Sequence, residues 1–158
     1  MDFLAQKKEY RFKNIENQVC RVHTHLAINN NNLKVWREND DKKSRKATKL
    51  IMDSLQDDNK YMFPDLVIVS SKYLKVVAAY DREKDVIYVN KGIYTHQIVK
   101  SHLKSSYFVA KDMRGILWHE YGYKLHWDAV KSFYKVHKSK YNDCLLYTSD
   151  AADDSTEV

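Results

Sequence analysis

His119, Glu120 and Tyr123 are the residues of this chain whose types and spacing point most directly to chemistry. Two histidines four residues apart on a helix can hold one zinc ion, and a Glu directly after the first can act as general base in hydrolysis. Here Tyr123 stands where the second His would be. On a helix, positions 119 and 123 lie about 40° apart around the axis and ~6 Å apart along it, so both side chains can meet at one metal. Glu120 is turned by about 100° and would address a water on that metal.

Tyr123 is a poor ligand at neutral pH, because an unperturbed phenol has a pKa of about 10. His126 lies about 10 Å from His119 along a straight helix, too far to complete the same tetrahedral site. The third ligand is unknown from the sequence. The downstream candidates, none of them at a persuasive spacing, are Asp128, His137 and Asp143.

The last fifteen residues, Cys144 to Val158, resemble the in-frame translation of a transposase-based sequencing adapter. We treat 144–158 as a non-native tail and expect the reading frame to be truncated near Asp143; the alternative is a flexible acidic C-terminus. Four acids and no base lie in this tail, so without it the formal net charge rises from +6 to +10. A charge of that size permits a polyanionic partner without requiring one.

The remaining length of roughly 140 residues suits one domain with a real core. We expect an N-terminal segment at 1–38 and a truncated domain at 39–143. Cys20 is the only cysteine outside the tail, which excludes a disulfide framework and favours a reducing compartment. Since the sequence shows neither a signal peptide nor an apolar run of membrane-spanning length, we expect a cytoplasmic protein without a membrane partner.

The first part of the chain has an ambiguous pattern. Residues 6–17 are charged, and 19–28 suit either a strand or the end of a helix. His23 and His25 would share one face of a strand, where they could hold a metal or simply face solvent. The asparagine run at 29–32 predicts a loop.

A helix is predicted at 39–59, with Asn39 or Asp40 as its N-cap. Its opposite face is rich in lysine, which suits solvation or phosphate binding. The apolar stripe at helical spacing consists of Ala47, Leu50, Ile51, Ser54 and Leu55.

Short β-branched runs at 66–69, 75–80 and 86–89 predict three strands. The second and third are expected to form a hairpin with a loop of about five residues, 81–85, closed by 90–92. Residues 95–105 suit a short helix or an irregular connection.

The last predicted element is a long helix from Lys111 or Asp112 to about 140, with Asp112 as N-cap. Its length exceeds the globular norm and leaves open a break after Trp127. Gly122 in its middle suggests that a strand or a substrate approaches closely, since glycine costs ~1 kcal/mol relative to Ala there. The apolar positions expected to share one side are Ile116, Leu117, Tyr123, Leu125, Ala129, Val130, Phe133 and Tyr134.

The segment from Ile116 to Tyr123 resembles the active-site helix of zincin metallopeptidases. The order of elements is also similar to that of zincin-like domains in phage minor head (head morphogenesis) proteins and related mobile-element proteins. A backing helix comes first, a hairpin follows, and the metal helix comes last. The hairpin contains Ala79-Tyr80-Asp81 and Ile87-Tyr88-Val89-Asn90. The resemblance covers roughly 40–134. It implies an α+β, zincin-like fold with a backing helix, a small sheet and a long C-terminal metal-site helix. It also implies Zn(2+) with His119 as first ligand, Glu120 as base, and hydrolysis of a protein or peptide substrate.

Two departures bear on activity: Tyr123 replaces the second ligand, and Lys124 is charged where the longer form of the pattern prefers an uncharged residue. We therefore expect a degenerate or truncated zinc-dependent metallopeptidase-like domain with impaired catalysis, located in the cytoplasm or in a phage virion. One alternative is a non-catalytic structural protein that contacts phage head proteins. Another is a basic module that binds nucleic acid through interleaved aromatic and lysine side chains. These are Tyr107, Tyr121, Tyr134 and Tyr141 among Lys104, Lys131, Lys135, Lys138 and Lys140.

Overall fold

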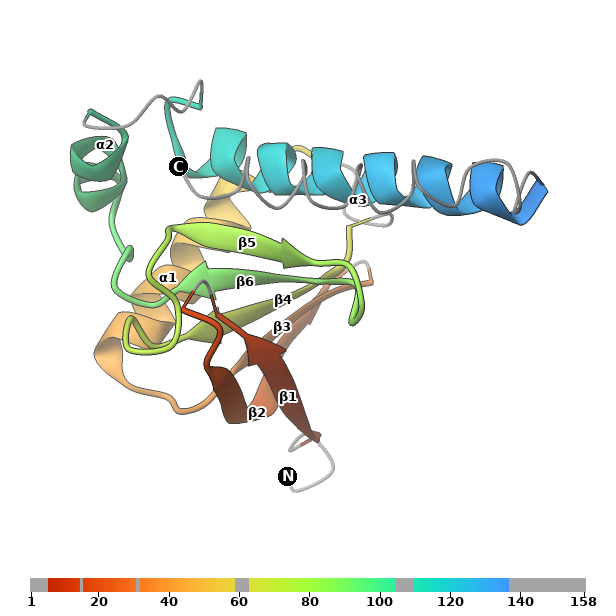
Figure 1. The fold of residues 1–158 in the computed structure, drawn as a ribbon. Coiled ribbons are helices and arrows are strands. Elements are labelled where there is room, and N and C mark those ends of the chain that lie inside the picture. Colours follow the sequence, from red (N-terminus) through yellow and green to blue (C-terminus); the bar gives the residue numbers. More distant parts are fainter. Residues whose placement is uncertain (1–5, 15, 31, 59–62, 105–109, 137–158) are drawn as a thin grey trace.

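Six strands form one curled sheet accompanied by three helices in the described part of the chain (Figure 1). The computed structural model describes residues 6–14, 16–30, 32–58, 63–104 and 110–136. The fold is therefore mixed α+β, as expected. In sheet order the strands are β1 (Lys7–Lys13), β2 (Val19–Asn30), β3 (Leu33–Arg37), β4 (Asp65–Val69), β6 (Val86–Asn90) and β5 (Ala78–Asp81). The helices are α1 (Lys42–Ser54), α2 (His96–Lys104) and α3 (Met113–Val136).

The sheet combines two kinds of pairing. β1, β2 and β3 pair antiparallel, β3, β4 and β6 pair parallel, and β5 pairs antiparallel with β6 at the opposite edge. Helix α1 is the crossover that joins parallel β3 to β4. The first three strands, which lie in the predicted N-terminal segment 1–38, are hydrogen bonded into the same sheet as the strands that follow.

The N-terminal part is more regular than its sequence pattern suggested. Residues 19–28 are strand, not the end of a helix, and Leu33–Arg37 is a strand that we did not predict. The predicted loop at 29–32 is also too long, because β2 continues to Asn30. Asn32 makes the tight reversal possible, since its φ of 68° lies in the left-handed region that asparagine tolerates.

Two hydrophobic cores lie on the two faces of the sheet. The larger core lies between the sheet and the helices and includes Leu66, Ile68, Ile87 and Val89. The smaller core fills the inside of the curl, where β1 folds over the sheet and Phe12 packs on Tyr88 with ring centroids 4.2 Å apart. β4 and β6 are buried on both faces, which explains their continuous apolar runs.

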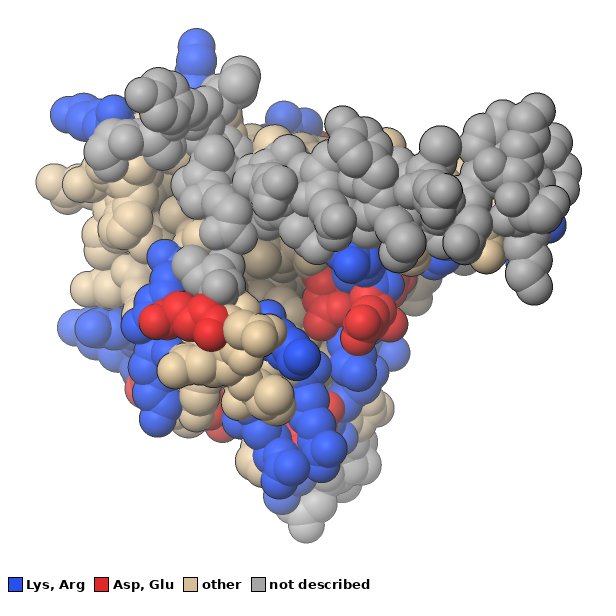
Figure 2. Space-filling view, viewed as in Figure 1, with Lys and Arg blue, Asp and Glu red and all other residues tan. Residues whose placement is uncertain are grey.

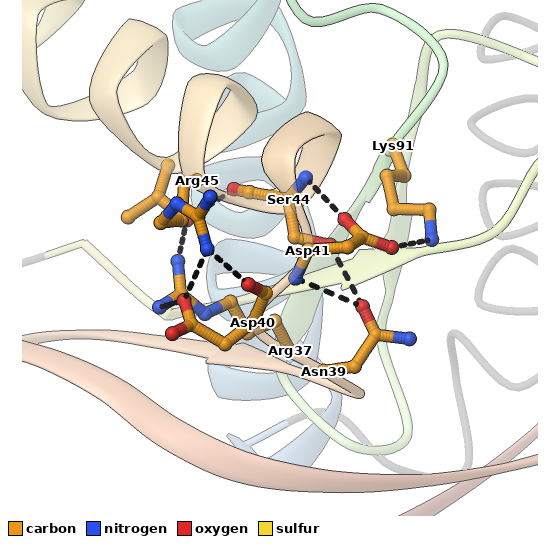
Figure 3. A network of polar contacts seen from close by, with 8 residues as sticks. Arg37, Asn39, Asp40, Asp41, Ser44, Arg45 and Lys91 are labelled. Carbon is orange, nitrogen blue, oxygen red and sulfur yellow. Dashed lines mark hydrogen bonds and ion pairs between the residues drawn. The ribbon is translucent and has the colours of Figure 1, made fainter.

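Helix α1 begins at Lys42, later than predicted, because its N-cap is Asp41 and not Asn39 or Asp40 (Figure 3). The Asp41 carboxylate accepts a hydrogen bond from the Ser44 backbone N–H at 2.8 Å and pairs with Lys91 Nζ at 2.9 Å. Asp40 instead binds Arg37, at 2.7 Å. The helix ends at Ser54, short of the predicted end at 59. Its apolar stripe is confirmed for the four buried positions Ala47, Leu50, Ile51 and Leu55.

The β5–β6 hairpin is confirmed, but β5 begins at Ala78 and not at 75. The Asn90 side chain explains the difference. Its amide donates to the carbonyl oxygens of Leu74 and Val76, at 3.0 and 3.2 Å, so these residues bind a side chain in place of a neighbouring strand.

The described C-terminal region forms two helices, α2 and α3. Residues 96–104 are helical, and α3 runs unbroken past Trp127 to Val136. Asp112 accepts a hydrogen bond from the Gly115 N–H at 2.8 Å, as expected of a cap. The predicted apolar stripe is wrong for Leu125 and Phe133, which are about half exposed, because the second half of α3 extends past the strands (Figure 1).

No described helix combines the length and the apolar character that a membrane span requires. The predicted tail at 144–158 lies outside the described residues, as do His137, Asp143, Tyr107, Lys138, Lys140 and Tyr141.

Candidate functional site

Helix α3 runs beside β5, the edge strand of the sheet. The Asn90 N–H donates to the Val77 carbonyl at 2.9 Å, which makes these two residues a hydrogen-bonded pair. Hydrogen-bonded and non-hydrogen-bonded residue pairs alternate along two antiparallel strands. Ala79 and Asp81 therefore direct their backbone N–H and C=O groups to β6. Tyr80 directs its N–H and C=O away from β6, to the free edge where α3 lies.

Glu120 lies at this edge and is completely buried. Neither of its carboxylate oxygens makes a hydrogen bond of normal geometry with a described residue. Burial raises the pKa of Glu120 to about 8, and the nearby Tyr80 N–H offsets only part of that increase. The Glu120 carboxyl is therefore mostly protonated at neutral pH.

Sequence analysis placed Glu120 toward a metal-bound water, and the structure places it on the face of α3 that meets the core. Spacing could have shown this, because Glu120 continues a helical stripe of buried residues at i, i+3, i+4, i+7 and i+8. The stripe consists of Met113, Ile116, Leu117, Glu120 and Tyr121.

His119 and Tyr123 lie side by side on α3, as their spacing predicts. Their ring centroids are 5.0 Å apart, in an edge-to-face arrangement. Both side chains are partly buried. Burial lowers the pKa of His119 below its ordinary value, so its imidazole is neutral at pH 7, the form that binds metals.

The other predicted ligands do not join this pair. His126 is exposed, Asp128 pairs with Lys124 and Lys131, and His23 lies 3.4 Å from Glu9 on the distant β1–β2 hairpin. The described residues contain no group of three or more His, Cys, Asp or Glu side chains that could hold a metal. The described residues therefore do not complete a zinc site.

Lys124 has a structural role that sequence analysis missed. Its Nζ lies 3.1 Å from both carboxylate oxygens of Asp85, in the β5–β6 loop, and 3.3 Å from Asp128. The Tyr80 hydroxyl donates to the same Asp85 at 2.6 Å. The charged residue that departs from the zincin pattern thus ties α3 to the hairpin.

Gly122 does not make the close contact that we expected. A Cβ atom at this position would have nothing within 4 Å. The expected approach of a strand is therefore wrong for the described residues.

A pocket of about 590 Å³ lies on the other face of the sheet, between the end of β1 and the β5–β6 loop. Its floor includes Phe12 and Tyr88, and basic side chains line it from both sides. None of its lining residues comes from α3. This pocket and the His119–Tyr123 pair are therefore separate features.

Comparison with protein-family models, with curated proteins and with solved structures finds no match for this chain.

Proposed function

We propose that this chain is a zincin-like, metallopeptidase-type domain in which Tyr123 occupies the position of the second zinc ligand, so that peptide hydrolysis is impaired. The observation that carries the proposal is the adjacency of His119 and Tyr123, with ring centroids 5.0 Å apart on one face of α3. An imidazole at position 123 would lie beside His119, close enough for both to reach one metal.

The surroundings of the pair support the same proposal. The order of α1, the β5–β6 hairpin and α3 is the order that the resemblance implies. Glu120 follows His119 directly and lies at the free edge of β5, with a pKa raised to about 8. Carboxyls with perturbed pKa values cluster at functional sites. The complete burial of Glu120 keeps it away from solvent water, which agrees with impaired hydrolysis.

Zinc content tests the proposal. The full chain and its Tyr123→His variant are purified, dialysed against micromolar zinc, and analysed for bound metal by mass spectrometry. We expect about one zinc per chain in Tyr123→His and none in the parent, because a neutral imidazole replaces a protonated phenol. Two matched controls, Tyr123→Phe and the double variant His119→Ala with Tyr123→His, should both remain free of zinc.

The alternative is a structural protein that never used a metal. It predicts that Tyr123→His binds no stoichiometric zinc although it folds and melts like the parent. That result would end the zincin proposal for this chain. Zinc that persists in the His119→Ala double variant would also contradict it, because the metal would then lie elsewhere.

A further inference from the structure

The β1–β2 hairpin has a strongly basic outer face. Along β1 the buried Tyr10 alternates with exposed charged residues, and along β2 the buried Cys20, Val22 and Thr24 do the same. The exposed face contains four Lys or Arg side chains, two His and one acid. Its residues are Lys7, Glu9, Arg11 and Lys13 on β1, and Val19, Arg21, His23 and His25 on β2.

The register brings like charges together on this face. Arg11 lies directly opposite Arg21. Like charges in that position destabilise a sheet, whereas opposite charges would stabilise it. Glu9 is the one carboxylate of the face, and its oxygens are shared among Arg11 Nε at 3.0 Å, Arg21 Nε at 3.6 Å and His23 Nε2 at 3.4 Å.

Ordinary solvation does not account for this arrangement, since a solvated face needs polar residues but not residues of one sign. Charged residues also protect an edge strand against aggregation. That reason requires charge but not charge of one sign. β2 pairs with β3 only from His25 onward, so Arg21 lies where β2 is hydrogen bonded to β1 alone and the two strands form a two-stranded ribbon. The basic residues therefore fit a polyanionic partner better than either explanation.

The position of the hairpin leaves this face accessible within the described part of the chain. Figure 1 shows β1 and β2 at the opposite end of the molecule from α3. Helix α1 lies against β3, where Arg37 binds Thr48 at 3.0 Å. Lys and Arg side chains gather over β1 in the lower part of the space-filling view (Figure 2).

We propose that the outer face of the β1–β2 hairpin binds double-stranded DNA, with Arg11 and Arg21 on backbone phosphates. A two-stranded ribbon fits the major groove of B-form DNA, which is about 12 Å wide. Seven paired residues span about 23 Å, enough to contact several phosphates on both sides of the groove. The narrow major groove of an RNA duplex does not admit such a ribbon. This inference does not depend on the proposed function of α3.

Fluorescence anisotropy of the full chain with a labelled 20-base-pair DNA duplex, at 50 to 200 mM salt, tests the inference. The affinity should fall steeply with salt, with a log–log slope of about −3 to −4 for four phosphate contacts. Arg11→Gln with Arg21→Gln should flatten the slope by about 2 and raise Kd about tenfold at 100 mM salt. The variant should melt close to the parent, because it removes a like-charge pair together with the exposed ion pairs of Glu9, which contribute little.

Lys131→Gln with Lys135→Gln is the matched control, because it removes the same charge from the exposed end of α3, where sequence analysis placed a nucleic-acid contact. We expect it to bind DNA as the parent does. Should the arginine variant melt early, Lys7→Gln with Lys13→Gln on β1 gives the same comparison. The inference is overturned by no binding at 50 mM salt, by a larger loss in the α3 variant, or by equal affinity for an RNA duplex of the same sequence.

Discussion

The backbone N–H of Tyr80 points away from β6 and toward the buried carboxyl of Glu120. An acidic side chain of α3 thus lies over the free edge of β5. Exposed strand edges invite pairing with other chains, and covering them with a helix is one way in which proteins prevent this. The contact is too weak to keep Glu120 ionised, because burial raises its pKa to about 8 despite the nearby N–H. The edge of β5 is therefore covered by a carboxyl that is mostly neutral at pH 7.

We predict that the protein loses stability between about pH 5 and pH 8 because of Glu120. An unfolded Glu has a pKa of about 4.3, whereas that of folded Glu120 is about 8. Between these values the folded chain retains a proton that the unfolded chain has lost, so the free energy of unfolding falls by up to ~1.4 kcal/mol per pH unit. Urea unfolding at pH 5 and pH 8 measures the effect. The free energy of unfolding of Glu120→Gln, taken relative to that of the parent, should be about 3 kcal/mol higher at pH 8 than at pH 5.

The titration of His119 changes stability with pH in the opposite sense to that of Glu120, so the two effects must be separated. Burial lowers the pKa of His119, so its contribution to stability is lost as the pH falls through that value. Because His119 is present in both proteins, its contribution largely cancels in the comparison of parent and Glu120→Gln. Parallel pH profiles for the two proteins would show that Glu120 is ionised in the folded state.

Much of the fold follows from local patterns in the sequence. The β-branched runs mark β4 and β6, and the i, i+3, i+4 spacing of Ala47, Leu50 and Ile51 marks the buried face of α1. Strand β1 was missed because half of its residues face solvent. Its charged residues concealed the alternation that buries Tyr10.

The candidate site was harder to predict, because its environment depends on tertiary structure. The adjacency of His119 and Tyr123 needs only a helix, and it was predicted. The burial of Glu120 was missed, although its helical spacing from Met113, Ile116 and Leu117 indicates it. Since Glu is almost never fully buried without a partner, the residue type itself pointed toward solvent.

Gly122→Ala should stabilise the protein by about 1 kcal/mol. The residue lies inside α3, where glycine is the poorer helix former, and an added Cβ has nothing within 4 Å. Gly115→Ala on the same helix is the matched comparison. There the added Cβ would lie 3.0 Å from the Ala110 Cβ, so we expect no gain. Urea unfolding at pH 7 measures both variants, and a loss of stability in Gly122→Ala would reveal a contact outside the described residues.

Asp41→Ala should destabilise the protein by about 1 kcal/mol at pH 7, because it removes the N-cap of α1. The hydrogen bond with Lys91, together with the Ser44 N–H, lowers the pKa of Asp41 to about 2. A carboxyl whose pKa is lower in the folded chain stabilises the protein at pH values above its pKa in the unfolded chain. That stability is lost as the pH falls toward its pKa in the folded chain. The cost of Asp41→Ala should therefore shrink by roughly half between pH 7 and pH 3. Its control is Asn39→Ala, at the predicted cap position, where we expect a change within about 0.5 kcal/mol.

Asn90→Ala should cost about 3 kcal/mol, because it removes the shared partner of several buried backbone groups. The Asn90 side chain donates to two carbonyl oxygens of the segment before β5 and accepts from the Gly92 N–H at 2.8 Å. Ser71→Ala removes one peripheral hydrogen bond to Asn90, of 2.8 Å, and should cost about 1 kcal/mol. Urea unfolding compares the two variants.

The same pair of variants tests whether Asn90 also affects the environment of Glu120. If the segment before β5 loosens in Asn90→Ala, water reaches the edge that Glu120 covers. The fall in stability between pH 5 and pH 8 should then become shallower than in Ser71→Ala. Equal pH profiles would show that Asn90 supports the hairpin without affecting the environment of Glu120.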